Sequence, residues 1–257
     1  MVWSKAAKNF LNALIPPAFW LGVWQLAALL VDRQVNGKGN ELLLPYPATV
    51  FSSLVRLMGK GEFFLIVFSS LGRILLGLIL GAAVGSLLAV LTCRSHWADQ
   101  LLSPAIRVVR AAPVASFILL VVLWTDKNFV PVVIAALMVV PVMWGNLSRG
   151  IRETDPQLLE LARAYRFSRW KTIHLIYLPC LHPYFTAAIT TATGLAWKSG
   201  VAAEVLCLPS SAMGTQIFST KYYLEIPDLF AWTAVVVTLS LLLEKLLRAL
   251  LGRKGVE

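Results

Sequence analysis

Among the ionisable residues of this chain, Arg73, Lys198 and Glu204 lie within long apolar stretches. A charge at membrane depth is costly unless it is paired or hydrated, so each residue marks an intramembrane ion pair or a polar pathway. On a pathway, Lys198 could attract an oxyanion. Lys198 and Glu204 stand about 240° apart on one helix, because each residue turns it by about 100°, so each should find its partner elsewhere.

A charged amphipathic segment separates two of the apolar stretches. Asp155-Pro156 predicts the start of its first helix, since the carboxylate can cap free amides and proline has no N–H to leave unpaired there. Arginine and lysine side chains at 163–171 flank its apolar positions. Such a helix is too polar to lie within lipid and too apolar for a solvent-exposed linker. Its composition therefore favours docking on another protein. The apolar positions are Leu158, Leu159, Leu161, Ala162 and Tyr165.

Two prolines follow this segment, Pro179 and Pro183. Proline removes an N–H and clashes with the preceding turn of a helix. We therefore expect a second cytoplasmic helix, from about Ser168, to end at Pro179, with an elbow before the next membrane helix.

The composition is typical of integral membrane proteins. Of 257 residues, 58% are hydrophobic and only 14% are charged, and the mean hydropathy is +0.74. The expected fold class is all-α, one transmembrane domain over residues 1–257. Stretches of about 20 apolar residues can cross a bilayer as helices. Six are expected, at approximately 10–31, 63–92, 106–124, 129–147, 184–207 and 229–250.

Basic residues gather on one side of these predicted spans. Of the 23 Lys and Arg residues, fifteen fall on one face and six on the other, and Arg73 and Lys198 lie within spans. Basic residues near span ends stay in the cytoplasm, so both termini and the loop at 148–183 are expected there. The net charge of +10 follows from this topology, and no nucleic-acid partner is expected.

The second span also carries a stripe of small residues. Gly77, Gly81 and Gly85 follow one another at four-residue spacing, in register with Arg73. Small residues in this register let another helix backbone approach closely. We therefore expect this face to pack against a second helix.

The residues typical of catalytic and metal sites do not form a recognisable pattern. The histidines and cysteines lack ligand-like spacing, and no nucleophile and base are set together, so no enzyme, metal or bound cofactor is expected. A Gly-x-x-x-x-Gly-Lys-Ser/Thr phosphate loop is also missing, so ATP and Mg²⁺ would bind a partner protein. The histidines and cysteines are His96, His174, His182, Cys93, Cys180 and Cys207.

The docking segment resembles the EAA loop of ABC importer permeases. Glu160, Ala162 and Ile176-x-Leu178-Pro179 match its pattern of Glu-Ala-Ala, three residues, Gly, nine residues and Ile-x-Leu-Pro. Two positions depart from it. Leu161 replaces the second alanine, and Arg166 stands where the family has glycine. Arginine in a left-handed turn costs about 1 kcal/mol, so we expect either a different turn geometry or an ATPase partner that contacts Arg166.

Further segments resemble the nitrate/sulfonate/taurine group of these permeases. They are Leu44-Pro45-Tyr46-Pro47, Ser70-Leu71-Gly72-Arg73 and Trp197-Lys198-Ser199-Gly200-Val201-Ala202-Ala203-Glu204.

The resemblance implies a type I permease with six transmembrane helices and a cytoplasmic coupling helix at 156–166. Its implied partners are cytoplasmic ABC ATPases, an external solute-binding protein, a second permease copy and membrane lipid. The solute would be a small anion such as a sulfonate, taurine or nitrate. A pyrimidine-type vitamin precursor, or a scaffold that recruits a cytoplasmic protein without transport, are the alternatives. The implied coupling residues are Leu158, Glu160, Leu161, Ala162, Tyr165, Arg166, Ile176, Leu178 and Pro179.

Overall fold

The computed structural model describes residues 5–34 and 40–252, and within these ranges all regular elements are helices. Two compact units share the chain. The first contains residues up to 65 and residues 216–236, and the second contains residues 66–215 and those from 237 onward.

The first unit brings helices from both ends of the chain together. Arg56 Nη2 lies 2.5 Å from Asp228 Oδ1, and the rings of Phe63 and Trp232 stack with centroids 5.2 Å apart. These contacts tie α3 and the beginning of α4 to the beginning of α12. The helices concerned are α1 (Lys5–Gln34), α2 (Asn40–Leu43), α3 (Pro47–Met58), α4 (Glu62–Arg94), α11 (Met213–Tyr222) and α12 (Ile226–Gly252).

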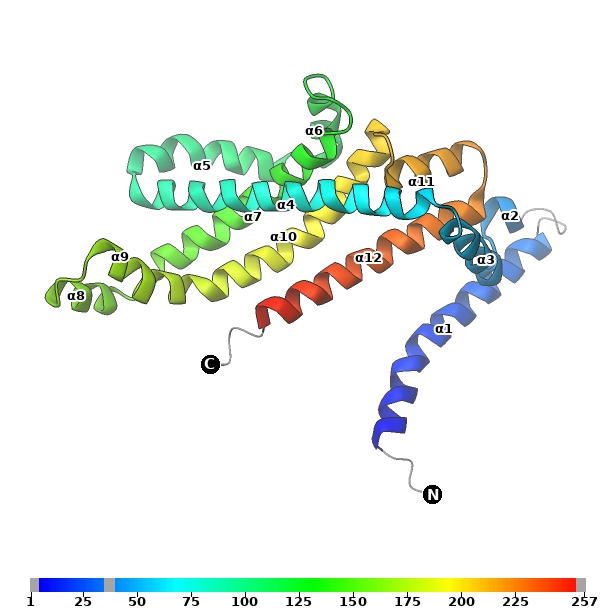
Figure 1. Cartoon of the computed structure of the whole chain (residues 1–257), viewed down its shortest axis with the longest axis horizontal. Helices are drawn as coiled ribbons and strands as arrows, with labels where there is room; N and C mark the ends of the chain where they lie inside the picture. Colours follow the sequence, from blue (N-terminus) through cyan, green and yellow to red (C-terminus); the bar gives the residue numbers. More distant parts are fainter. Residues whose placement is uncertain (1–4, 35–39, 253–257) are drawn as a thin grey trace. The chain divides into compact units, whose positions relative to one another are not determined.

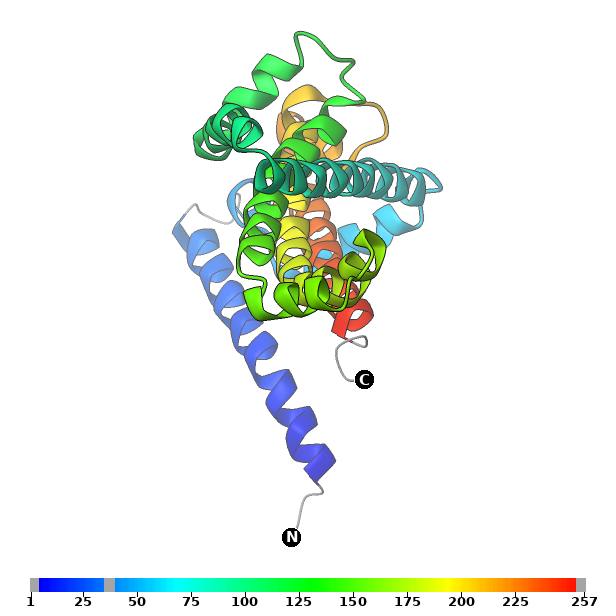
Figure 2. The ribbon, with the colours of Figure 1, turned by 90° about the vertical axis from the view of Figure 1, so that its left-hand side faces the viewer.

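The second unit is organised around α7 and α10, which lie side by side in both views (Figures 1 and 2). Short helices α8 and α9 connect them at one end (Figure 1). The remaining helices of this unit are α5 (His96–Ala111), α6 (Val114–Val121), α7 (Val130–Arg152), α8 (Pro156–Ala164), α9 (Arg169–Thr172), the π-helical turn η1 (Ile173–Tyr177) and α10 (Leu178–Cys207).

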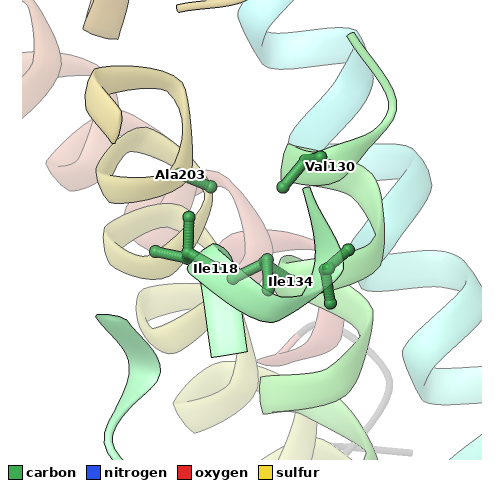
Figure 3. Close-up of a cluster of buried hydrophobic side chains, with 5 residues drawn as sticks. Ile118, Val130, Ile134 and Ala203 are labelled. Atoms are coloured by element: carbon green, nitrogen blue, oxygen red, sulfur yellow. The ribbon is translucent and has the colours of Figure 1, made fainter. Parts of the chain in front are cut away.

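A cluster of buried apolar side chains joins α6, α7 and α10 (Figure 3). Ile118 and Val121 come from α6, Val130 and Ile134 from the first turns of α7, and Ala203 from the end of α10. Where helices pack inside a membrane, such a cluster stabilises their association through van der Waals contacts. The hydrophobic effect contributes little there, because lipid is as apolar as the side chains. The cluster therefore fixes the end of the α7–α10 pair that lies opposite α8.

Several helices are long and apolar enough to cross a bilayer. In the described ranges these are Ile15–Gln34 within α1, α4, α7 and part of α12, four in all, and the bent pair of α5 and α6 makes a fifth if it counts as one span. Several membrane crossings are therefore supported. The stretch 184–207 lies within α10, which is not among these four helices.

The third predicted span, 106–124, is wrong in its start and its shape. The helix begins ten residues earlier, at His96, and breaks at Ala112 and Pro113, where α5 and α6 meet at 106°. A residue before proline is pushed out of the helical region, and Ala112 has φ −78° and ψ 144°. The apolar run therefore continues across a bend.

The predicted helix end at Pro179 and the elbow after it are also wrong. From Arg169 the chain runs through α9 and η1 directly into α10, with Pro179 in the first turn and Pro183 inside the helix. A π-helical turn contains one more residue than an α-turn, and it is a known way to re-satisfy backbone groups near a proline. No separate elbow divides these elements.

The glycine stripe of α4 faces α7 at very short range. A Cβ on Gly77 would lie 2.5 Å from the carbonyl oxygen of Val132, one on Gly81 2.6 Å from that of Ala136, and one on Gly85 2.7 Å from Met143 Cβ. These neighbours are backbone atoms or Cβ atoms, which cannot rotate away. Only glycine therefore permits this approach of the two helices.

We expect Gly81→Val to lower the melting temperature of the purified chain, because the new side chain forces α4 away from α7. Overpacking of this kind costs about 1–3 kcal/mol, or several degrees for a chain of this size. Gly72→Val is the matched control, since a Cβ on Gly72 of the same helix meets nothing within 4 Å. Equal melting temperatures of the two variants would contradict this packing role.

Candidate functional site

Arg73 and Glu204 form an ion pair between α4 and α10. Arg73 Nη1 lies 3.5 Å from Glu204 Oε1, and the Glu204 side chain is fully buried. Oε2 of Glu204 accepts hydrogen bonds from Ser70 Oγ at 2.9 Å and from the backbone N–H of Gly214 at 3.1 Å. The carboxylate is thus held from three sides, as a buried charge requires.

The loop between α10 and α11 completes this network. Arg73 Nη2 donates to the carbonyl oxygen of Ser210 at 2.5 Å, and the N–H of Ser210 donates to Asn128 Oδ1 at 2.8 Å. The loop turns sharply, with Leu208 at φ 51° and Ser211 at φ 47°. Left-handed conformations cost energy in residues other than glycine, so the contacts around Arg73 hold the loop in a shape that it would not adopt alone.

Ser70 and Gly214 were not predicted to belong to this site. Ser70 accepts from the N–H of Met213 at 2.9 Å while it donates to Glu204, so it links α4 to both other elements. A Cβ on Gly214 would collide with the Cβ of Glu204. Ser70 stands three residues before Arg73, on the same face of α4. The three-residue spacing between Ser70 and Arg73 is the sequence signal that could have assigned Ser70 to the site.

Lys198 lies apart from this network. Its side chain is exposed on α10, on the same face as Thr191 and Leu195, which precede it by seven and three residues. Among the described residues, it has no ion-pair partner. The sequence therefore pointed to three intramembrane charges, and the structure pairs two of them and leaves the third on an open helix face.

A cavity of about 600 Å³ lies beside this face of α10. Thr191 and Leu195 form one wall, and Asn146 and Arg149 of α7 form another. Arg110, near the end of α5, faces it from a third side. The cavity combines two guanidinium groups, one amide and one hydroxyl group with mostly apolar lining residues. Arg149 lies 3.8 Å from Glu153, so Arg110 is the guanidinium better placed to attract an anion.

The predicted start of α8 is confirmed. Asp155 Oδ1 accepts from the N–H of Gln157 at 2.8 Å, and Pro156 occupies the first turn. Leu158, Leu161 and Tyr165 are 40%, 51% and 72% exposed and share one face of the helix. This face is an unpartnered apolar surface at the connection between α7 and α10.

The remaining residues of the predicted docking segment divide between surface and interior. Glu160 is exposed on the side of α8 away from the apolar face, and Ala162 is 3% exposed. Ile176, within η1, is 5% exposed, whereas Leu178 is 49% exposed. Pro179 lies in the first turn of α10. Ala162 and Ile176 thus support the segment from inside while the exposed residues form its surface.

Arg166 keeps the left-handed conformation that glycine usually supplies after a helix. Its φ is 50°, its N–H donates to the carbonyl of Arg163 at 3.0 Å, and the N–H of Phe167 donates to that of Ala162 at 2.8 Å. These two bonds are those of a Schellman motif, in which the residue after the cap is left-handed. The departure from glycine therefore leaves the turn intact at a cost of about 1 kcal/mol.

Residues 73–254 match the family described as binding-protein-dependent transport system inner membrane component. The chain belongs to this family. The match covers α4 from Arg73 onward, the docking segment and α10, so both candidate regions lie inside it.

Individual relatives agree with this assignment. The chain is 28% identical over 247 residues to the putative aliphatic sulfonates transport permease protein SsuC of Bacillus subtilis, covering 96% of this chain and 87% of the relative. It is 28% identical over 205 residues to the nitrate import permease protein NrtB of Synechococcus elongatus, covering 77% and 72%. It is therefore an ABC importer permease of the nitrate/sulfonate/taurine group.

A solved structure supports the fold. The structure of a bacterial ABC transporter that imports the acidic polysaccharide alginate superposes with a TM-score of 0.66 at 15% identity, covering 98% of this chain and 100% of that one. At this identity, the likeness concerns the arrangement of helices alone.

Proposed function

We propose that this permease forms half of the membrane pathway for a small anion, of which a sulfonate, taurine or nitrate is the best candidate. A second copy of the chain completes the pathway, an external binding protein delivers the solute, and separate ATPases supply the energy. The relatives named for sulfonate and nitrate transport support an anionic solute. The exposed side chain of Lys198 on α10 is the observation that assigns the proposed pathway to particular residues.

The pathway follows the open face of α10. An uncompensated ammonium group is costly in lipid, so Lys198 needs water, a passing anion or a partner protein. The cavity with Arg110 and Arg149 continues from the same face, through Thr191. This succession of cationic groups would attract an anion without enclosing it on all sides. In the complete transporter, a second copy of the chain would cover this polar face.

Energy reaches the pathway through the docking segment. With no phosphate loop of its own, the chain depends on ATP and Mg²⁺ bound by its ATPase partner. The exposed apolar face of α8, Leu158, Leu161 and Tyr165, fits a groove as helices do in peptide recognition. The basic residues of the segment, together with those near both ends of the chain, support a cytoplasmic location for this side and for both termini.

Lys198→Met should lower uptake of the transported anion about tenfold, because it removes a charge that would otherwise attract the solute; a charged hydrogen bond contributes about 1.5–3 kcal/mol. Uptake is measured in proteoliposomes that contain the permease, its ATPase and its binding protein, with sulfonates, taurine and nitrate as candidates. The solute is identified by its stimulation of ATP hydrolysis. Lys198→Arg is the control that keeps the charge.

Unchanged uptake by Lys198→Met would remove Lys198 from the pathway. A pyrimidine-type precursor that stimulates hydrolysis, with no response to any anion, would contradict the anionic solute. A chain that recruits the ATPase but supports no uptake with any solute would instead be a scaffold.

A further inference from the structure

A second cavity, of about 400 Å³, lies between α5 and the last turns of α7. Charged side chains dominate its walls. Arg107, Arg149 and Arg152 face two carboxylates, those of Asp99 and Glu153. The walls therefore carry one net positive charge. Arg149 also lines the larger cavity beside α10, but the proposed pathway uses none of the other charged residues of this cavity.

Both carboxylates are already paired. Arg152 Nη2 lies 3.4 Å from Asp99 Oδ2, and Arg149 Nε lies 3.8 Å from Glu153 Oε1. In the described ranges, Arg107 has no ion-pair partner. Arg107 interacts with the Asp99 carboxylate only beyond ion-pair distance, so it is the cation of the cavity that no close carboxylate compensates.

The wall also holds a buried hydroxyl group that has no partner. Ser148 is 6% exposed, and its Oγ is buried without a hydrogen bond to any described residue. By contrast Ser103, across the cavity, donates to Asp99 Oδ1 at 2.5 Å. Buried polar atoms are rarely left unpaired, so the Ser148 hydroxyl points to a group that binds inside the cavity. A hydroxyl group and a guanidinium without a close ion pair that line one cavity are suited to the oxygens of an anion.

The outer face of α5 shows where this cavity lies in a bilayer. Trp97, Leu101 and Val108 are 81%, 76% and 65% exposed and share one face of the helix. A helix with an apolar face beside cations is typical of the membrane interface, where tryptophan is also favoured. On the topology given under Proposed function, this interface is the cytoplasmic one. Basic pockets at that depth bind the head groups of anionic lipids.

We propose that this cavity binds a tetrahedral oxyanion through the guanidinium of Arg107 and the hydroxyl of Ser148. The anion is a phosphate group, either on an anionic lipid or free in solution, since both present the same oxygens. Only its placement at the cytoplasmic interface rests on the proposed function.

The test measures binding without transport. The purified chain, in neutral detergent with zwitterionic lipid, is heated at constant ionic strength with increasing inorganic phosphate or phosphatidylglycerol, and unfolding is followed by tryptophan fluorescence. We expect a saturable rise in melting temperature with at least one of the two. Arg107→Gln and Ser148→Ala should each weaken binding about tenfold, as expected for loss of a charge-assisted hydrogen bond.

Arg94→Gln is the matched control, because Arg94 is exposed at the end of α4 and does not line the cavity. It should bind as the unaltered chain does. Ser148→Ala removes only an unpartnered hydroxyl group, so this variant should fold normally without the anion. It therefore still tests the proposal if Arg107→Gln fails to fold. A response to phosphate identifies a free anion, and a response to phosphatidylglycerol alone identifies a lipid.

No saturable response of the unaltered chain to either compound would overturn the proposal. So would equal affinity in Ser148→Ala and the unaltered chain. Because uptake is not measured, a failed transport assay leaves this result standing, and failure here leaves the proposed transport untouched.

Discussion

Leu161→Asp is expected to abolish ATP-driven uptake while the permease remains folded. Leu161 is 51% exposed at the centre of the apolar face of α8, so the substitution should cost little stability. In the assembled transporter, it would bury a carboxylate without a partner in the ATPase groove, which costs several kcal/mol. The measurement is uptake in proteoliposomes, together with the amount of ATPase that co-purifies with the tagged permease.

Arg163→Gln is the control for charge. It also makes the segment one unit less positive, but Arg163 lies on the opposite side of α8 from Leu161. It should retain most of the uptake. If Leu161→Asp kept both its ATPase and its uptake, the docking role of this face would be untenable.

Glu204→Ala is expected to destabilise the chain strongly. It removes the acceptor of Ser70 and of the Gly214 N–H and leaves Arg73 without its carboxylate. Breaking a buried ion pair by deleting one partner costs about 3–5 kcal/mol. For a chain of this size, that corresponds to a fall of about 10 °C in melting temperature. Thermal unfolding in detergent, followed by tryptophan fluorescence, measures it.

Glu204→Gln separates charge from hydrogen bonding. Its amide oxygen can still accept from Ser70 and from Gly214, so it should lose less than half as much stability as Glu204→Ala. Equal losses would show that the charge itself, through Arg73, dominates the network. A negligible loss in Glu204→Ala would contradict the structural role of the network.

Hydrophobicity and spacing were sufficient for the individual helices. The apolar stretches, the glycine stripe and the Asp155-Pro156 start each depend on residues close in sequence, and the structure has helices at those places. The EAA-like spacing also led to the correct family. The break at Pro113 could have been predicted from the residue itself, but the long apolar run around it favoured a straight span.

Contacts between distant segments could not be read from the sequence. Pairing Arg73 with Glu204 depends on the loop at 208–212 and on the approach of α4 to α10, which no local pattern specifies. The continuous helix through Pro179 depends on a π-helical turn, for which the sequence has no established signal. In the sequence, Arg107 is only one of the fifteen basic residues counted on the cytoplasmic face. Its lack of a close ion pair becomes visible only in the structure, where Asp99 and Glu153 pair with other arginines.

The unbroken course of η1 into α10 has a mechanical consequence. A rod with a joint absorbs movement at the joint, whereas a stiff helix delivers displacement and torque applied at one end to the other. Leu178 and Lys198 are separated by about 30 Å of continuous helix, at about 1.5 Å per residue, and Pro183 within it is the point where this helix can bend. A small rotation of the helix imposed beside α9 would therefore change the direction of the Lys198 ammonium group without any local rearrangement around it.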